Sequence, residues 1–304
     1  KKAKLASLNL SNVNIEKRNS VLKQFSQYLR TNSKSILNSN KKDISNANPK
    51  EHSSSFLDRL KLDEDRLHSI IKNIKDVLSL KDPVGIRELL HKRPNVLDVY
   101  RQTIPLGLIG IIYESRPNVT SDAAVLCLKS GNTTILRGGS ECFETNKALV
   151  VSIKKALVET DFSADCVNMV PCTDREIMKY ILTLDELIYL IIPRGGEGLI
   201  RFVSENSRIP VIKHYKGVCH VYVDQHANLE KAHRVSLNSK VQRPGVCNAM
   251  ETLLVHKKIA DSFLPSFIKS LKEKNVIIHG SKEVLKYGNK DDINVVEEDN
   301  WYKE

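Results

Sequence analysis

The first hundred residues carry apolar side chains at the spacing of an α-helix. Residues three or four positions apart lie on one face of a helix, so such a stripe predicts an amphipathic helix packed on a core. Two stripes are present, one formed by Val21, Leu22, Phe25 and Leu29 and the other by Leu67, Ile70, Ile71, Ile74, Val77 and Leu78. Asp63 precedes the second stripe and is its expected N-cap. The polar stretch between the stripes, residues 38–55, is expected to be an exposed and mobile connection.

From Val96 onward the pattern changes to short apolar runs separated by helical segments. The runs predict strands at residues 96–102, 108–113, 133–136, 167–170, 187–192 and 210–212. Helices are expected at residues 120–129, at 144–159 and from about Gly198. Strands that alternate with helices indicate a parallel sheet covered by helices on both faces.

After His220 the same alternation begins again. Strands are expected at residues 221–223, 252–255 and 276–278, and helices at 229–238 and 259–274. A chain of 304 residues is long enough for two cores. We therefore expect an α/β protein of two domains, residues 1–215 and 216–304, with a cleft near residues 213–217.

The composition is typical of a soluble globular protein. Hydrophobic residues make up 41% and charged residues 27% of the chain. No apolar run has the length needed to cross a bilayer, and the basic start KKAKLASLNL lacks the apolar stretch of a secretory signal. These features predict a cytoplasmic protein that does not bind membranes.

The net charge of +11 raises the alternative of nucleic-acid binding. The lysines are spread among acidic residues along helical segments, as in KLDEDRLHSIIKNIKD, and form no dense basic block. A phosphorylated substrate and a phosphorylated cofactor explain the charge better. The six cysteines form no CxxC pair and have no histidines at zinc-site spacing, which predicts reduced thiols and no metal site.

Two glycine-rich loops follow predicted strands, where doubly wound sheets bind their ligands. The first loop contains Arg137, Gly138, Gly139 and Ser140, and the second contains Pro193, Arg194, Gly195 and Gly196. Glycines allow a ligand to approach the backbone, an arginine can contact a phosphate, and free N–H groups at a helix start can hold an anion. Neither loop matches the GxGxxG fingerprint, so each is open to interpretation as a tight turn or as a ligand site.

Cys247 lies in the run RPGVCNAMETLLVH, between a predicted bend and a predicted strand. Pro244 and Gly245 favour the bend, and a cysteine on a turn can be presented to a cleft. Arg243, four residues upstream, can stabilise a thiolate or an anionic substrate. A cysteine before an apolar strand is also often a small core residue, so both interpretations stay open.

Four segments together closely resemble the gamma-glutamyl phosphate reductase family of the aldehyde dehydrogenase superfamily. They are GLIGIIYESRPNVTSDAAVLCLKSGNTTILRGGSE from Gly107, LIIPRGGEGLI from Leu190, HYKGVCHVYVD from His214, and the Cys247 segment. The resemblance runs in order from about Phe56 onward. It implies an aldehyde dehydrogenase-like fold of two Rossmann-like domains, with the cofactor domain first, the catalytic domain second, and the family's C-terminal segment absent from this chain.

The resemblance implies NADPH-dependent reduction of L-glutamyl 5-phosphate to L-glutamate 5-semialdehyde through a cysteine thioester, with release of phosphate, in proline biosynthesis. It also implies a functional link to glutamate 5-kinase and a homo-oligomer at full length. Two alternatives stay open: another acylating aldehyde dehydrogenase, or the reductase domain of a bifunctional pyrroline-5-carboxylate synthase. The activity of the chain without the C-terminal segment is a further open question.

The resemblance also assigns expected roles to site residues. Cys247 is the expected nucleophile, and the Asn118 amide is the expected oxyanion-hole donor. In the superfamily the first loop contacts the adenosine ribose and the second lies along the cofactor near the nicotinamide. NAD-preferring relatives carry an acid three places after the residue matching Arg137, and Ser140 stands at that place here, which implies NADP.

The expected substrate-binding residues are Arg116, Arg243, Lys213 and Lys216. Hydrolytic aldehyde dehydrogenases have a water-activating glutamate before their second-domain strand. The matching stretch here, residues 211–217, contains no acid. This difference implies an acyl-enzyme that exchanges with phosphate, for which the two lysines are candidate ligands.

Overall fold

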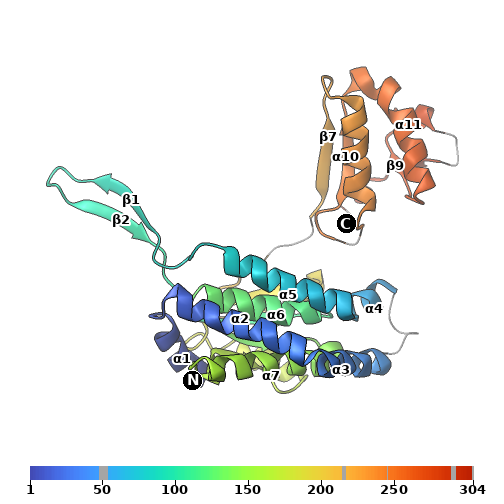
Figure 1. Cartoon of the computed structure of the whole chain (residues 1–304). Coiled ribbons are helices and arrows are strands. Elements are labelled where there is room, and N and C mark those ends of the chain that lie inside the picture. The colour runs from blue at the N-terminus through green and yellow to red at the C-terminus, as the bar shows by residue number, and fades with distance from the viewer. Residues whose placement is uncertain (48–53, 214–216, 245, 289–291, 303–304) are drawn as a thin grey trace. The chain divides into compact units, whose positions relative to one another are not determined.

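The structure of this protein is a computed structural model that describes residues 1–47, 54–213, 217–244, 246–288 and 292–302. The chain divides into two compact units, Lys1–His214 and Tyr215–Glu304 (Figure 1). Each unit has its own sheet, and each is described separately below. Among the described residues, no helix is both long enough and apolar enough to span a membrane.

The first unit is built on a four-stranded parallel sheet with the strand order β5-β4-β3-β6. The central strand β3 (Leu108–Tyr113) pairs with β4 (Thr133–Arg137) and with β6 (Leu190–Arg194), and β4 pairs with β5 (Val167–Met169). The predicted parallel sheet is therefore confirmed. Two expectations were wrong: β6 begins three residues later than expected, and the strand expected at residues 210–212 is only a single bridge, between Val211 and Ile191.

Side chains of β3 alternate between two hydrophobic cores, one on each face of the sheet. Ile109 and Ile111 join the core formed with α2 (Ile15–Thr31), α5 (Glu64–Ser79), α6 (Pro117–Lys129) and α7 (Phe143–Glu159). Leu108 and Ile112 join the core formed with α8 (Arg175–Ile181) and α9 (Glu197–Asn206). Helices thus cover both faces, as predicted, although α8 itself was not expected. The N-terminal helix α1 (Lys2–Leu10) contacts β3 and β4.

The two helices expected from their apolar stripes are confirmed as α2 and α5. The four stripe residues of α2 are buried, and so are Leu67, Ile70, Ile71 and Ile74 of α5. The Asp63 side chain accepts a hydrogen bond from the backbone N–H of Arg66 at 3.0 Å, which makes it the N-cap of α5. Figure 1 shows α2 and α5 side by side, and both contact α6.

The connection expected at residues 38–55 is helical where the structure describes it, although Lys41, Lys42 and other residues in it are exposed as expected. Residues up to Asn46 belong to a helix, α3 (Ser33–Asn46), and α4 (Ser54–Leu60) follows. Asn40 and Asp43 are buried because their side chains bond backbone groups of neighbouring elements. The polarity of these two residues suggested exposure, but their side chains form internal hydrogen bonds. Residues 48–53 lie outside the described part of the chain.

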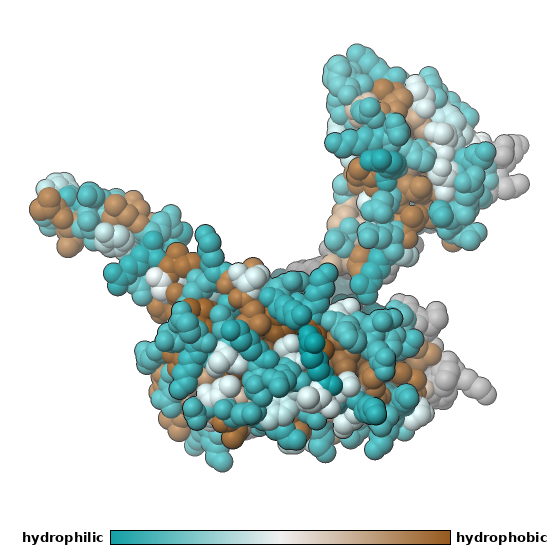
Figure 2. Space-filling model, in the orientation of Figure 1, coloured by the Kyte–Doolittle hydropathy of each residue, from teal (hydrophilic) through white to brown (hydrophobic). Residues whose placement is uncertain are grey.

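The strand expected at residues 96–102 does not belong to the parallel sheet. It is β2 (Asp98–Gln102), and it pairs antiparallel with β1 (Arg87–Lys92), which was not predicted (Figure 1). Both faces of this hairpin are exposed, including the apolar side chains of Leu90, Leu97 and Tyr100. Figure 2 shows hydrophobic residues along the hairpin surface. The apolar run therefore marked an exposed ribbon where we expected a core strand.

The second unit contains a two-stranded parallel sheet, β7 (Cys219–Val223) with β8 (Met250–Val255). The helices α10 (Leu229–Val241) and α11 (Ala260–Glu273) pack against this sheet and share its hydrophobic core. The strand expected at residues 276–278 was wrong. The next strand is β9 (His279–Gly280), which pairs with β10 (Asn294–Val295).

Five short 3₁₀ helices complete the described elements. They are η1 (Ser140–Cys142), η2 (Ala164–Cys166), η3 (Lys257–Ile259), η4 (Leu285–Tyr287) and η5 (Glu298–Tyr302). The first of them, η1, begins at Ser140, the last residue of the first glycine-rich loop.

Candidate active site

The carboxyl ends of three neighbouring strands bring most of the predicted site residues of the first unit to one edge of the sheet. Arg137 at the end of β4 pairs with Ile112, and Arg194 at the end of β6 pairs with Tyr113. Both glycine-rich loops and the segment from Glu114 to Asn118 therefore leave the sheet at the same edge. This is the edge at which open α/β sheets bind ligands.

The first loop has closely covered glycines and a partly unsatisfied arginine. A Cβ atom on Gly138 would lie 2.2 Å from the Asn146 Nδ2 atom, and one on Gly139 would lie 2.2 Å from a Glu141 carboxylate oxygen. A larger residue at either position would force the Asn146 or the Glu141 side chain to move. Arg137 donates to the carbonyl oxygens of Gly138 at 3.1 Å and Thr173 at 3.0 Å. Its Nε atom is buried without a partner, and a bound oxygen atom would satisfy such a donor.

A chain of buried hydrogen bonds supports this loop from below. The Tyr113 hydroxyl bonds the Thr120 hydroxyl at 2.7 Å, and the Thr120 hydroxyl bonds the Asn146 side-chain oxygen at 2.7 Å. The Asn146 amide in turn lies 3.1 Å from the Cys142 sulfur. Burial raises the pKa of Tyr113 well above its usual range and raises the pKa of Cys142 to about 12. Both groups are therefore neutral near pH 7 and act as structural supports.

The second loop is held by an acid that sequence reasoning missed. The backbone N–H of Gly196, the N-cap of α9, donates to the Glu114 Oε2 atom at 2.9 Å. A Cβ atom on Gly195 would lie 2.5 Å from the same oxygen. One N–H at the start of α9, where we predicted a bound anion, thus already faces an internal carboxylate. No sequence signal connects an acid after one strand with a glycine after another.

Asn118, the predicted oxyanion donor, is exposed in the first turn of α6. Its amide donates to the Asp122 Oδ2 atom at 3.1 Å, one helical turn away. Burial raises the pKa of Asp122, and the bonds from Asn118 and Asn73 oppose that rise. The spacing of four residues was a usable signal for this pair, which the sequence reasoning did not consider.

Arg116, a predicted substrate ligand, is half-buried and is the N-cap of α6. Ser115, which precedes it, has φ +39, a backbone conformation that is uncommon for residues other than glycine. The backbone N–H and the hydroxyl of Ser115 both donate to the Glu141 Oε1 atom, at 2.5 Å and 2.7 Å. Glu141 was also not predicted as a site residue.

In the second unit, Cys247 lies on a turn just before β8. The turn is closed by the backbone N–H of Ala249, which donates to the Val246 carbonyl at 3.0 Å. The Cys247 side chain is exposed, so the predicted turn setting is confirmed, although Gly245 lies outside the described residues. The Cys247 carbonyl accepts a bond from the Cys219 thiol at 3.4 Å.

The other five cysteines are all less exposed than Cys247. Cys127, Cys142 and Cys166 are buried, and burial raises the pKa of their thiols to about 12, about 12 and about 11. A thiol with such a pKa is protonated and unreactive near pH 7. Cys172 and Cys219 are half-buried. Cys247 is thus the most accessible thiol in the described part of the chain, and its role as the nucleophile stays a prediction.

The remaining predicted substrate ligands are only partly placed. Arg243 is exposed, four residues before Cys247 in the second unit. Lys213 is exposed near the end of the first unit, and Lys216 lies outside the described residues. Their roles stay predictions.

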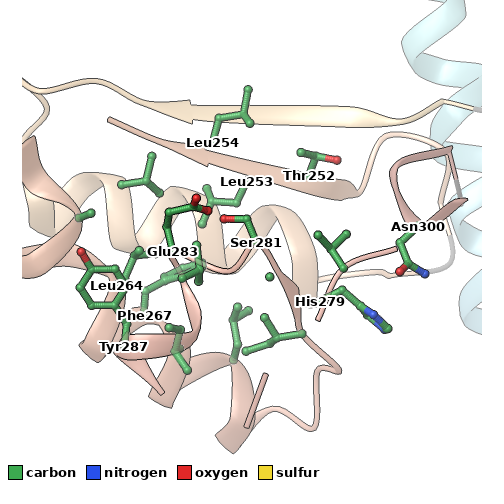
Figure 3. Close-up of a pocket in the computed structure, with 18 of the residues that line it drawn as sticks. Thr252, Leu253, Leu254, Leu264, Phe267, His279, Ser281, Glu283, Tyr287 and Asn300 are labelled. Carbon is green, nitrogen blue, oxygen red and sulfur yellow. The ribbon is translucent and has the colours of Figure 1, made fainter. Parts of the chain in front are cut away.

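A pocket of about 970 Å³ in the second unit contains none of the predicted site residues (Figure 3). Its lining is mainly apolar and comes from β8, α11 and the segment that follows α11, and it includes Leu253, Leu264 and Phe267. The lining contains no cysteine and neither glycine-rich loop. We therefore do not place the reaction there. Over the described ranges, the structure also holds no group of three acidic, histidine or cysteine side chains arranged for a metal ion.

Comparison with known proteins gives long and consistent matches. A family model described as "Aldehyde dehydrogenase family" matches residues 1–288. A protein of Caldicellulosiruptor saccharolyticus called gamma-glutamyl phosphate reductase is 47% identical over 305 residues, covering 100% of this chain and 73% of its own length. A protein of the same name from Idiomarina loihiensis is 46% identical over 270 residues, covering 89% of this chain.

A solved structure agrees with these sequence matches. The crystal structure of gamma-glutamyl phosphate reductase from Thermotoga maritima superposes with a TM-score of 0.91 at 41% identity, covering 99% of this chain and 72% of the other. The chain spans 65% of the length of the Idiomarina relative. The relatives are therefore longer than the sequence described here.

Proposed function

This chain belongs to the aldehyde dehydrogenase family and, within it, to the gamma-glutamyl phosphate reductases, and we propose that the protein reduces L-glutamyl 5-phosphate to L-glutamate 5-semialdehyde with NADPH, releasing phosphate. The observation that carries the proposal is 47% identity over the whole chain to a relative of that name. The reaction would serve proline biosynthesis in the cytoplasm.

The first unit fits a nicotinamide dinucleotide. Both glycine-rich loops lie at the edge of the sheet where open α/β sheets bind ligands, and the buried Nε atom of Arg137 in the first loop has no partner. Arg137 to Ser140 would hold the adenosine end, and Pro193 to Gly196 would lie along the rest of the cofactor. When bound, NADPH supplies the hydride of the reduction.

Cys247 would act on the acyl carbon of the substrate. Its thiolate attacks that carbon, the bond between the carbon and the phosphate oxygen breaks, and a thioester forms. Hydride addition to the thioester carbon and departure of the thiolate then give the semialdehyde. Arg243, four residues before Cys247, is proposed to bind an anionic group of the substrate.

The amide N–H of Asn118 and the backbone N–H of Cys247 would stabilise the oxyanion of each tetrahedral state. Loss of one such donor costs about a hundredfold or more in rate. Asp122 accepts a bond from the Asn118 amide at 3.1 Å and so orients it. Arg116, Lys213 and Lys216 are proposed to bind the carboxylate or phosphate groups of the substrate.

The substrate chemistry also implies where this step stands in a reaction sequence. An acyl phosphate is unstable in water, so a kinase that phosphorylates the side-chain carboxylate of glutamate must supply it nearby. We propose a functional link to glutamate 5-kinase for this reason. The full-length protein is proposed to be a homo-oligomer.

Replacement of the nucleophile tests the proposal. In the full-length protein, Cys247→Ala should abolish NADP-dependent oxidation of glutamate 5-semialdehyde in phosphate buffer. The melting temperature should stay unchanged because the side chain is exposed. Retention of more than a few per cent of wild-type activity would remove the covalent mechanism.

A buried cysteine provides the matched control. Cys127 lies in the core on α6, so Cys127→Ala should lower the melting temperature while retaining most of kcat. The expected loss of stability is about 1 kcal/mol. A wild-type protein without reductase activity toward this substrate would contradict the proposed function itself.

A further inference from the structure

The backbone between β3 and α6 takes a conformation that depends on contacts from residues elsewhere in the chain. Ser115 is buried and has φ +39, in the left-handed region that residues with a Cβ atom rarely adopt. Such a conformation persists when surrounding contacts hold it in place. Both hydrogen-bond donors of Ser115, the backbone N–H and the hydroxyl, donate to one carboxylate oxygen of Glu141.

Glu141 is itself fixed by the first glycine-rich loop. Its carboxylate turns back over Gly139, where a Cβ atom would come within 2.2 Å of it. The next residue, Cys142, is fully buried against Asn146 and so anchors η1. The carboxylate therefore extends from a rigid base toward Ser115.

The contact bears directly on the predicted oxyanion donor. Ser115 is followed by Arg116 as N-cap, by Pro117 as the first residue of α6, and by Asn118. The direction in which α6 begins thus depends on the Ser115 backbone. The Asn118 amide has one further restraint on α6, its bond to Asp122.

We propose that Glu141 is a positioning residue that holds the Ser115–Asn118 turn in its reactive conformation and so links the cofactor loop to the oxyanion donor. The inference rests on the proposed function for its catalytic consequence. The role depends on the position of the acceptor oxygen, because both Ser115 donors meet the same oxygen atom. The negative charge of Glu141 is secondary.

If the position of the acceptor oxygen matters more than the charge, the Gln variant of Glu141 should retain more activity than the Asp variant. Glu141→Gln keeps an acceptor oxygen at the same distance from the backbone and loses the charge. Glu141→Asp keeps the charge and is one methylene shorter, so it cannot reach Ser115 from the same base. Glu141→Ala loses both. Glu16→Ala, which removes an exposed glutamate in the first turn of α2, is the matched control.

Kinetics of the full-length protein test the catalytic consequence. We expect kcat for semialdehyde oxidation to fall by on the order of tenfold to a hundredfold in Glu141→Ala and Glu141→Asp, since a misplaced donor loses much of its effect on the transition state. Glu141→Gln should keep at least about a third of the wild-type kcat. The Kd for NADPH, measured by fluorescence titration, should change by less than about threefold in all three variants.

Amide hydrogen exchange tests the structural part independently of activity. Exchange at the amides of Ser115, Arg116 and Asn118 should rise in the Ala and Asp variants and stay near the wild-type rate in the Gln variant. Unchanged exchange in Glu141→Ala would overturn the inference even if the protein had a different activity. Higher kcat in the Asp variant than in the Gln variant would also overturn it, because charge would then be the property that matters. A loss confined to the Kd for NADPH would make Glu141 a cofactor ligand instead.

Discussion

At the scale of single residues, Arg137 is the residue expected to discriminate between the two nicotinamide cofactors. A charged pair to a 2′-phosphate contributes roughly 1–3 kcal/mol. Arg137→Met should therefore lower kcat/KM for NADPH by about tenfold to a hundredfold more than kcat/KM for NADH. The ratio is the useful measurement, because Arg137 also bonds the carbonyl oxygens of Gly138 and Thr173 and its loss affects both cofactors.

Arg87→Met, in the exposed β1 strand, is the matched control and should leave the ratio unchanged. Comparable kcat/KM values for NADPH and NADH in the wild-type protein would show that the first loop does not discriminate. Ser140 would then have no bearing on cofactor choice.

The sequence indicated the turn at Cys247 but not the acids that bond the loops near the sheet edge. The turn at Cys247 could be recognised because a Pro-Gly pair precedes it and an apolar strand follows. Glu114 and Glu141 could not be recognised, because each bonds backbone N–H groups of another loop. A backbone donor is present at almost every residue, so such a contact leaves no pattern in the sequence.

At the scale of elements, Asp43 joins α3 to the start of α7. No side chain of the residue before α7 caps that helix, and Asp43 instead accepts bonds from the backbone N–H groups of Thr145 at 2.8 Å and Glu144 at 3.2 Å. Asp43→Ala should reduce the free energy of unfolding by about 1–2 kcal/mol, the usual cost of losing a cap. Urea denaturation measures the change, with Asp76→Ala at an exposed position of α5 as control. A loss no larger than that of the control would contradict this role.

The burial of Asp43 also predicts the direction in which the stability of the fold changes with pH. Burial raises the pKa of the Asp43 carboxyl, and the bonds from Thr145 and Glu144 only partly oppose the rise. A carboxyl with a higher pKa in the folded state favours folding when it is protonated. The stability of the wild type relative to Asp43→Asn should therefore fall as the pH rises from about 4 through the folded-state pKa, and then level off. An opposite slope in paired denaturation curves would contradict burial as the dominant influence.

Helices whose apolar residues are buried and whose polar residues are exposed were predicted. Elements with buried polar residues or exposed apolar residues were not. The stripes of α2 and α5 face a single apolar core, so periodicity sufficed. The helix α3 was missed because Asn40 and Asp43 are buried and polar. The hairpin was misread because Leu97 is apolar and yet 59% exposed. Periodicity reports burial only when apolar residues are buried and polar residues are exposed.

At the scale of the whole molecule, the chain separates into two α/β units whose predicted functional residues differ. The unit Lys1–His214 contains both glycine-rich loops and Asn118, and the unit Tyr215–Glu304 contains Cys247 and Arg243. The four-stranded sheet of the first unit and the β7–β8 sheet of the second are both parallel, which agrees with the alternation of strands and helices in the sequence. The boundary between the units, at His214 and Tyr215, falls within residues 211–217, the stretch that lacks an acid.

The absence of an acidic residue from residues 211–217 leads to a prediction for the full-length protein. A thioester on Cys247 that meets no activated water must pass its acyl group to another nucleophile, and we expect inorganic phosphate to serve. Oxidation of glutamate 5-semialdehyde by NADP should therefore depend on added phosphate, and arsenate should replace it. The initial rate of NADPH formation, measured with and without phosphate at constant ionic strength, should differ by at least about tenfold. Lys213→Met should raise the KM for phosphate, whereas Lys23→Met, on α2, should not. Rapid production of glutamate without phosphate or arsenate would place the protein among the hydrolytic dehydrogenases.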